Sequence, residues 1–268
     1  MNNTLTILAE NDFYKSSDKV LKKSICPSIS YYSKLIRIVY KSNRFVARNE
    51  YNGKNWALSS YWILNALESV GIKHYIEGMK NITSFDGPAV LIGNHMSTLE
   101  TMVLPAIINP VKKVVFIQKE ELVNYPLFGP VSAARHPILV GRSNPREDLM
   151  RVIEAGAERL KDGRSIVVFP QKTRSEYLDC KSFNTLGEKI AKKNNVPIIP
   201  IAIMSDAWGN SSIKAIKDFG KIDPSKDVHI AFGEPFKVTG NGSEEHNRIL
   251  DFIKSKFIEW GRKEFIIE

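Results

Sequence analysis

Short apolar runs alternate with helical patterns from residue 72 to the end of the chain. Aliphatic and β-branched runs of this length are typical of buried strands, and apolar positions at helical spacing are typical of amphipathic helices. Strands and helices in such alternation form a largely parallel or mixed sheet flanked by helices. The pattern therefore predicts an α/β domain over residues 72–268. We expect strands at residues 89–92, 114–117, 138–140, 165–169, 198–203 and 228–232, and helices at residues 98–108, 145–160, 183–195 and 243–260.

Two amphipathic helical patterns precede this domain. One follows Cys26-Pro27, and the other ends at Gly71, a residue type that often caps helices. The chain before these helices is predicted to be an irregular or helical arm. The two apolar faces could bury against each other, or they could lie in a membrane interface with Trp and Tyr at the depth of the head groups. We therefore treat residues 1–71 as an N-terminal helical segment with an expected role in membrane docking.

The basic charge of the chain is concentrated in this N-terminal segment. The whole chain has 38 Lys and Arg against 29 Asp and Glu, a formal net charge of +9. Residues 1–60 hold ten of the basic and four of the acidic side chains, with aromatic residues between them. Such a segment suits an anionic surface, either lipid head groups or nucleic acid. The alternative is a solvated helix pair whose aromatic side chains pack on the core, and composition alone leaves both open.

Composition and cysteine usage indicate an ordinary folded protein of a reducing compartment. Hydrophobic residues make up 43% and charged residues 25% of the chain. Cys26 and Cys180 lie far apart and outside any Cys/His cluster, which argues against a structural zinc site. The N-terminus has no basic segment before its first apolar run, so no signal peptide is expected. The longest uncharged stretches have about 13 residues, fewer than the roughly 18–20 needed to cross a bilayer. We expect a cytoplasmic protein.

A histidine and a carboxylate stand together where the strand at residues 89–92 leads into a helix. The stretch is Gly-Asn-His-Met-Ser-Thr-Leu-Glu, with His95 in the turn and Glu100 in the first helical turn. Ligands of α/β sheets bind at the carboxyl ends of the strands, and a His beside a carboxylate is a common general base. A competing interpretation is a capping box, in which Glu100 accepts a hydrogen bond from the Ser97 amide. This stretch alone leaves both interpretations open.

Cationic side chains follow two further strands. Lys172 and Arg174 lie in the sequence Phe-Pro-Gln-Lys-Thr-Arg-Ser after the strand at residues 165–169, and Arg142 follows the strand at residues 138–140. Backbone amides in such a turn, together with Arg, suit a phosphate group.

The chain has no phosphate loop, dinucleotide fingerprint, HExxH or GxSxG motif. Nucleotide hydrolysis, Rossmann redox chemistry, zinc proteolysis and the usual serine hydrolase chemistry are therefore excluded.

The order and spacing of these motifs resemble the glycerol-phosphate and lysophosphatidic acid acyltransferase family. The family motif Asn-His-x-Ser-x-x-Asp is similar to residues 94–100, and its second block is similar to residues 119–142. Its Phe-Pro-Glu-Gly-Thr-Arg-Ser motif is similar to residues 169–175, and Val-Pro-Ile-Val-Pro-Val is similar to residues 196–201. The resemblance covers roughly residues 72–235, and four blocks in the correct order are specific.

Two departures from the family pattern concern the site itself. Glu100 stands where the family has Asp, which keeps the carboxylate on a longer side chain. Gln171-Lys172 stand where the family has Glu-Gly. Because the family's third block helps to hold the glycerol phosphate of the acceptor, the second departure bears more on the acceptor than on acyl transfer.

The resemblance implies transfer of a fatty acyl group from a thioester donor, acyl-CoA or acyl carrier protein, to a hydroxyl of a lysophospholipid such as lysophosphatidic acid. His95 would be the general base and Glu100 would orient its ring. No metal and no organic cofactor is implied, and the N-terminal helices would dock on the inner face of the membrane. The residues expected to bind the acceptor are Ser97, Arg142, Gln171, Lys172, Thr173 and Arg174.

Two functions of other classes are alternatives. The altered third motif is compatible with a non-catalytic protein that binds anionic lipid on an acyltransferase scaffold. Nucleic-acid binding through the basic N-terminal segment has no recognisable motif behind it, so no nucleic-acid partner is expected.

Overall fold

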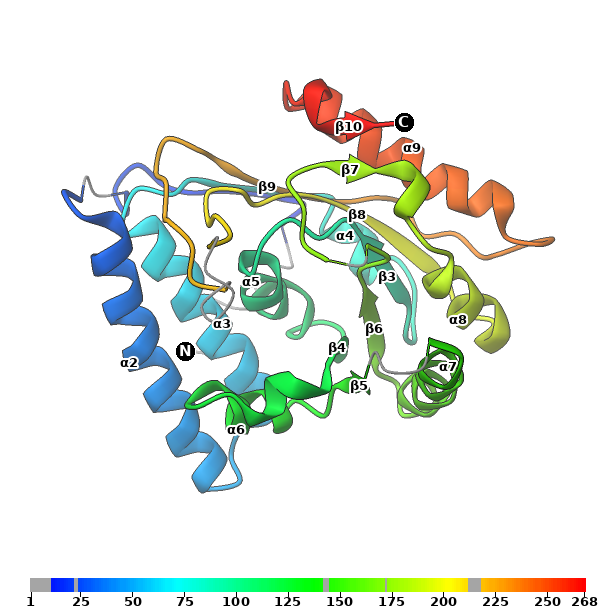
Figure 1. Ribbon diagram of the computed structural model, residues 1–268, viewed down its shortest axis with the longest axis horizontal. Helices are drawn as coiled ribbons and strands as arrows, with labels where there is room; N and C mark the ends of the chain where they lie inside the picture. Colours follow the sequence, from blue (N-terminus) through cyan, green and yellow to red (C-terminus); the bar gives the residue numbers. More distant parts are fainter. Residues whose placement is uncertain (1–10, 22–23, 142–144, 172, 212–217) are drawn as a thin grey trace.

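A mixed eight-stranded sheet forms the centre of the computed structural model, which describes residues 11–21, 24–141, 145–171, 173–211 and 218–268 (Figure 1). The strand order is β1-β2-β9-β8-β3-β6-β4-β5. β3 pairs in parallel with β6 and β8, whereas the β8–β9 and β1–β2 pairs are antiparallel. The strands of this sheet are β1 (Phe13–Lys15), β2 (His74–Glu77), β3 (Val90–Gly93), β4 (Val114–Lys119), β5 (Ile138–Val140), β6 (Ser165–Val168), β8 (Ile198–Met204) and β9 (Val228–Phe232).

Helices cover both faces of the sheet, with one apolar cluster on each side. The cluster on one face includes side chains of α2, α3 and α5, and the cluster on the other includes side chains of α7, α8 and α9 (Figure 1). β3, β6 and β8 are buried along their whole lengths, as expected for strands covered on both faces. The helices are α2 (Pro27–Ala47), α3 (Gly53–Glu68), α4 (Lys80–Thr83), α5 (Leu99–Ile108), α6 (Phe128–Ala133), α7 (Pro145–Lys161), α8 (Leu186–Asn194) and α9 (Ser243–Glu259).

The α/β fold class predicted from the sequence is confirmed. Each predicted strand and helix of residues 72–268 is present, with ends that differ by up to three residues. The structure also contains short elements that the sequence analysis did not predict, because they have no clear sequence pattern. They are α4, α6, β2, a second small sheet of β7 (Leu178–Asp179) with β10 (Ile266–Ile267), and the 3₁₀ turns η1 (Glu120–Asn124), η2 (Cys180–Ser182) and η4 (Lys263–Phe265).

Part of the predicted N-terminal arm is a strand, so that prediction was wrong for residues 13–15. β1 pairs antiparallel with β2, and the Ser16 amide extends the ladder by donating to the His74 carbonyl at 3.0 Å. This strand forms only against a partner some sixty residues away, and three residues carry too short a pattern to reveal it.

The two predicted N-terminal helices are present, and they pack into the same core as the sheet. α3 contacts both α2 and α5, and Trp56 near its start is buried. α2 buries Tyr31, whose ring meets that of Trp208 at a centroid distance of 5.0 Å. Asn52 caps α3 by accepting from the Asn55 amide, and Gly71 takes a φ of 102° just after the helix. In the described parts of the chain, we find no helix with the length and apolar character to span a bilayer.

Candidate active site

The turn between β3 and α5 is bonded to the neighbouring strand β8 at Asn94, the residue that precedes His95. The Asn94 side chain donates to the Ile203 carbonyl at 2.7 Å and accepts from the Ile203 amide at 2.9 Å. At Gly93, a Cβ atom would lie 2.8 Å from the Ile201 carbonyl oxygen, so only glycine allows this approach of the strands. The turn that carries His95 therefore begins from a rigid strand end.

His95 and Glu100 are in direct contact. His95 Nδ1 lies 2.9 Å from Glu100 Oε1, and the carboxylate is fully buried. The same Oε1 accepts hydrogen bonds from the amides of Met96 and Ser97 at 2.7 and 2.9 Å. Oε2 accepts from the hydroxyls of Ser97 and Ser205 at 3.1 and 2.6 Å. Glu100 thus accepts the Ser97 amide bond expected of a capping box and also contacts the histidine, so the two interpretations of the sequence do not exclude each other.

The charge state of Glu100 follows from these contacts. Burial alone would raise the pKa of the Glu100 carboxyl, but the hydrogen bond and charge interaction with His95, with further bonds from Ser205 and Ser97, hold that pKa below its usual value. An ionised carboxylate can only accept hydrogen bonds, so this contact favours the tautomer of His95 that carries the proton on Nδ1 and donates it to Glu100. Nε2 is then the nitrogen that can take a proton from a substrate.

The imidazole lies flat against Phe169, just beyond the end of β6. The two rings are stacked, with centroids 4.4 Å apart and an interplanar angle of 9°. The side chain of His95 is 20% exposed, in contrast to the complete burial of Glu100. The histidine is therefore held between a carboxylate and an aromatic wall with one edge accessible.

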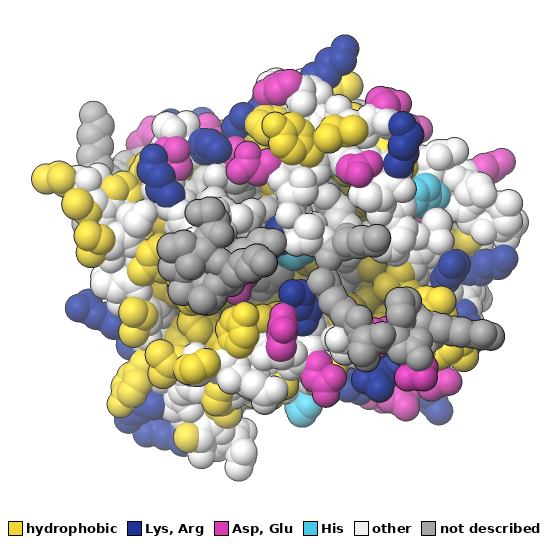
Figure 2. All heavy atoms as spheres, viewed as in Figure 1, with side chains coloured by type: hydrophobic (Ala, Val, Ile, Leu, Met, Phe, Trp, Pro, Cys, Tyr) yellow, Lys and Arg dark blue, Asp and Glu magenta, His cyan; other side chains and the backbone are white. Residues whose placement is uncertain are grey.

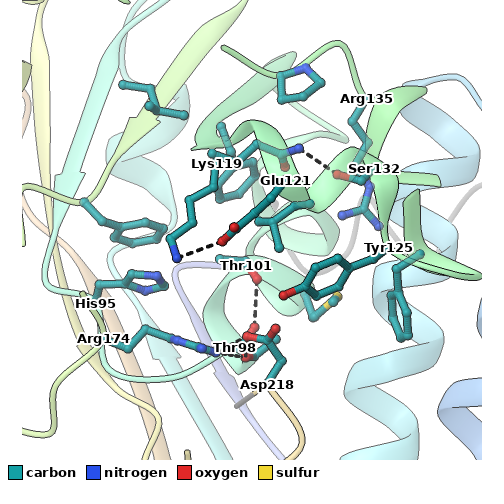
Figure 3. A pocket seen from close by; sticks show the side chains of 18 of the residues that line it. His95, Thr98, Thr101, Lys119, Glu121, Tyr125, Ser132, Arg135, Arg174 and Asp218 are labelled. Carbon is teal, nitrogen blue, oxygen red and sulfur yellow. Dashed lines mark hydrogen bonds and ion pairs between the residues drawn. The ribbon is translucent and has the colours of Figure 1, made fainter. Parts of the chain in front are cut away.

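Arg174 is the one cation predicted to bind the acceptor that lies within the described residues, and it stands beside His95 (Figure 3). Its guanidinium makes an ion pair with Asp218 at 2.6 Å and donates to the Thr98 hydroxyl. Thr98 also donates to Asp218 at 3.3 Å. Asp218 had no signal in the sequence, because it lies outside every motif and reaches the site only through the fold.

The other predicted binding residues have different surroundings. Thr173 is exposed and lines the same cavity as His95, as does the largely buried Gln171. Ser97 is buried and bonds to Glu100 and Ser205. Arg142 and Lys172 lie outside the described residues. Ser205 was missed, although its position directly after β8 places it at the edge of the sheet that carries His95.

A cavity of about 380 Å³ extends from His95 towards α2 and α3. Polar and charged groups surround His95, and the wall between β4, α5 and the N-terminal helices is mainly apolar (Figure 3). The described residues contain no group of three or more His, Cys, Asp or Glu side chains suited to a metal ion. The apolar and aromatic side chains that line the cavity include Leu35, Trp56, Met102, Phe116, Phe128, Trp208 and Phe219.

A second ion pair stands near His95, at the side of the cavity opposite Arg174 (Figure 3). Lys119 at the end of β4 lies 3.0 Å from Glu121, and both side chains are partly exposed. The Arg135 guanidinium packs over the Trp56 ring at 5.1 Å. The described cations around the cavity are therefore engaged with acidic or aromatic groups.

Comparison with known proteins agrees with this geometry. A family model described as Acyltransferase matches residues 73–204. The 1-acyl-sn-glycerol-3-phosphate acyltransferase of Pseudomonas aeruginosa is 32% identical over 158 residues, which cover 59% of each chain. The enzyme of that name from Cocos nucifera is 25% identical over 173 residues, covering 64% of this chain and 53% of the relative. The chain thus spans little more than half the length of these two relatives.

A solved structure shares the fold. The 1-acyl-sn-glycerophosphate acyltransferase PlsC of Thermotoga maritima superposes with a TM-score of 0.65 at 20% identity, over 88% of this chain and 95% of that one. The family match contains His95, Glu100 and Arg174. It ends with strand β8, directly before Ser205. Residues 73–204 thus match the acyltransferase family model, and the resemblance of the chain to the glycerol-phosphate and lysophosphatidic acid acyltransferases is confirmed.

Proposed function

We propose that this protein is an O-acyltransferase that transfers a fatty acyl group from a thioester donor to the hydroxyl of a lysophospholipid. Lysophosphatidic acid is the first candidate acceptor, because the curated relatives are named for that substrate class. The observation that carries the proposal is the contact of buried Glu100 with partly exposed His95, beside a cavity with an apolar wall.

The proposed reaction uses His95 Nε2 as the general base. Nε2 takes the proton of the acceptor hydroxyl while its oxygen attacks the thioester carbonyl carbon, and Glu100 stabilises the imidazolium. Collapse of the tetrahedral intermediate forms the ester, breaks the carbon–sulfur bond and returns the proton to the departing thiolate. A base so placed contributes a rate factor of about 10²–10⁴.

Arg174 is the proposed anchor for the acceptor phosphate. Its side chain lines the cavity that holds His95, and a guanidinium can bind phosphate through two hydrogen bonds. Asp218 is ion-paired with this guanidinium in the structure, so a bound phosphate would bind the guanidinium beside Asp218 or in its place. The proposal also keeps Arg142, Lys172 and Thr173 as contacts of the acceptor.

The apolar wall of the cavity is the proposed site of an acyl chain. Trp56, Phe116 and Phe128 come from α3, β4 and α6, so the N-terminal helices help to build this wall. Burial of apolar surface contributes about 0.8 kcal/mol for each methylene group. The donor, either acyl-CoA or acyl carrier protein, would present its thioester to His95 from the open side.

Docking of α2 on the inner face of a membrane is the second element of the proposal. Ile29, Ile36 and Tyr40 are exposed on one side of this helix, and they recur at helical spacing. Arg37 and Lys41 are exposed beside them. Figure 2 shows hydrophobic side chains gathered along the edge of the molecule where α2 lies. An apolar stripe with adjacent basic residues suits the interface of an anionic membrane.

Mass-spectrometric detection of acyl transfer in the presence of anionic vesicles tests the proposal. The donors are acyl-CoA and acyl carrier protein, and the acceptors are a panel of lysophospholipids and glycerol 3-phosphate. We expect an acylated lipid that disappears with His95→Ala and persists with His136→Asn, a control at an exposed histidine outside the cavity.

Two results would contradict the proposal. Full activity of folded His95→Ala protein would remove His95 as the base. No turnover of any donor by folded wild-type protein that still binds the vesicles would favour the lipid-binding alternative.

A further inference from the structure

The peptide of His95 is held from both sides by the turn that follows β6. Its amide donates to Gln171 Oε1 at 2.6 Å, and its carbonyl accepts from the Ser175 amide at 2.9 Å. The stacked ring of Phe169 belongs to the same turn. One segment therefore determines where both the backbone and the ring of His95 lie.

Both polar ends of the Gln171 side chain bind backbone groups. Oε1 accepts from His95, and Nε2 donates to the Tyr177 carbonyl at 3.2 Å. The residue is only 7% exposed, so water does not replace these bonds easily. An amide N–H can only donate and a carbonyl can only accept, which fixes the orientation of the Gln171 amide.

A carboxylate could not make the same pair of bonds. Its first oxygen could accept from His95, but its second would face the Tyr177 carbonyl oxygen, and two acceptors would meet in a largely buried place. Leaving buried acceptors unpaired is unfavourable, and more so when one of them is charged. The amide at residue 171 is thus matched to the position of Tyr177 in this chain.

We propose that Gln171 is a positioning residue, whose side-chain amide clamps the His95 peptide to the Tyr177 carbonyl and so keeps the imidazole between Glu100 and Phe169. Its polar atoms are engaged with backbone and are not offered to the acceptor. The inference rests on the proposed acyl transfer for its kinetic consequences. Misplacement of a catalytic group by about 1 Å can cost a hundredfold in rate.

The kinetic test compares Gln171→Glu, which keeps the size of the side chain, with wild type. We expect kcat to fall about 100-fold while KM for the lysophospholipid stays within about twofold, because orientation is lost and binding is not. Asn81→Asp is the matched control. Asn81 also donates from a side-chain amide to a backbone carbonyl, that of Phe232 at 2.9 Å, and it does not line the cavity. This control should lose stability in thermal denaturation and keep kcat.

A second readout does not depend on turnover. Hydrogen exchange of the His95 amide should be about tenfold faster or more in Gln171→Ala than in wild type, because the bond that protects it is gone. Wild-type kcat in Gln171→Glu, a raised KM with unchanged kcat, or unchanged exchange in Gln171→Ala would each overturn the inference. Absence of transfer by wild-type protein would instead contradict the proposed function, and the exchange measurement would still decide whether the clamp exists.

Discussion

Among the buried glutamates that lie near a histidine, Glu100 and Glu68 have contrasting surroundings. Glu100 Oε1 is 2.9 Å from His95 Nδ1, whereas Glu68 Oε1 is 3.8 Å from His74 Nδ1. Glu100 receives hydrogen bonds from two backbone amides and two hydroxyls as well. Glu68 receives bonds from the hydroxyls of Tyr14 and Ser16, at 2.6 and 2.5 Å. The Glu100 carboxylate therefore receives more hydrogen bonds than the Glu68 carboxylate.

The pKa values of the two carboxyls move in opposite directions. Burial raises the pKa of Glu68, and the bonds from Ser16 and Tyr14 lower it too little to compensate. At Glu100 the interaction with His95 and the additional donors outweigh burial and lower the pKa. Burial also lowers the pKa of His74 to about 3, and its ring has no hydrogen-bond partner among the described residues. The donors around Glu100 and the partial exposure of the His95 ring therefore favour His95 over His74 as the proposed base.

The Glu68 cluster has a structural role instead. Tyr14 and Ser16 belong to the β1 region, Glu68 ends α3, and the His74 amide at the start of β2 donates to the Ser16 hydroxyl at 2.8 Å. The cluster thus fastens the N-terminal strand to a helix and to the sheet. Two pairs of matched substitutions and one change of pH should separate the two Glu–His pairs.

Replacement of each glutamate by glutamine should have the largest effect on kcat, and the effect should differ most between the two pairs. Glu100→Gln should lower kcat about 100-fold, because the imidazolium loses its stabilising charge during proton transfer. Glu68→Gln should leave kcat unchanged, because Glu68 bonds to Tyr14 and Ser16 and does not line the cavity of His95. Steady-state rates with the same donor and acceptor measure both. Equal losses of activity in the two variants would contradict the distinction.

Acid should destabilise the protein through His74. The folded pKa of about 3 lies below the ordinary value of 6.5, so the unfolded chain binds a proton that the folded chain does not. The stability contribution is full above about pH 6.5 and is lost as the pH falls towards 3, by up to about 1.4 kcal/mol per pH unit. Urea unfolding at several pH values measures the slope. His74→Leu should make it shallower, and an unchanged slope would refute this cause.

Loss of one hydroxyl donor at each carboxylate should have the smallest effect. Ser205→Ala removes the 2.6 Å bond to Glu100 and should lower kcat a few-fold, because the other donors remain. Ser16→Ala removes the 2.5 Å bond to Glu68 and should reduce only stability, by about 1–2 kcal/mol. Rates and thermal denaturation of both variants provide the measurements. A loss of kcat in Ser16→Ala would place the Glu68 cluster in the catalytic path.

The sequence predicts best what is local. His95 and Glu100 are five residues apart at a strand-to-helix turn, so their contact follows from the order of elements. The long apolar strands are equally clear, since each is buried on both faces.

Contacts between distant segments explain what the sequence leaves out. Ser205 reaches Glu100 across 105 positions, and Asp218 reaches Thr98 across 120. Nothing near either residue in the chain indicates the partner. Gln171 was expected to bind the acceptor, because its motif suggests a phosphate site. Its bonds to His95 and Tyr177 depend on how two turns meet in space.

We propose that Glu100 holds the proton of His95 on Nδ1 and so leaves Nε2 free to act as the base. Nitrogen-15 NMR of the imidazole at mildly alkaline pH tests this directly, with His95→Ala protein to assign the signal. The structure predicts the tautomer with the proton on Nδ1, bonded to Glu100, and a bare Nε2. A proton on Nε2 with a bare Nδ1 would contradict the account.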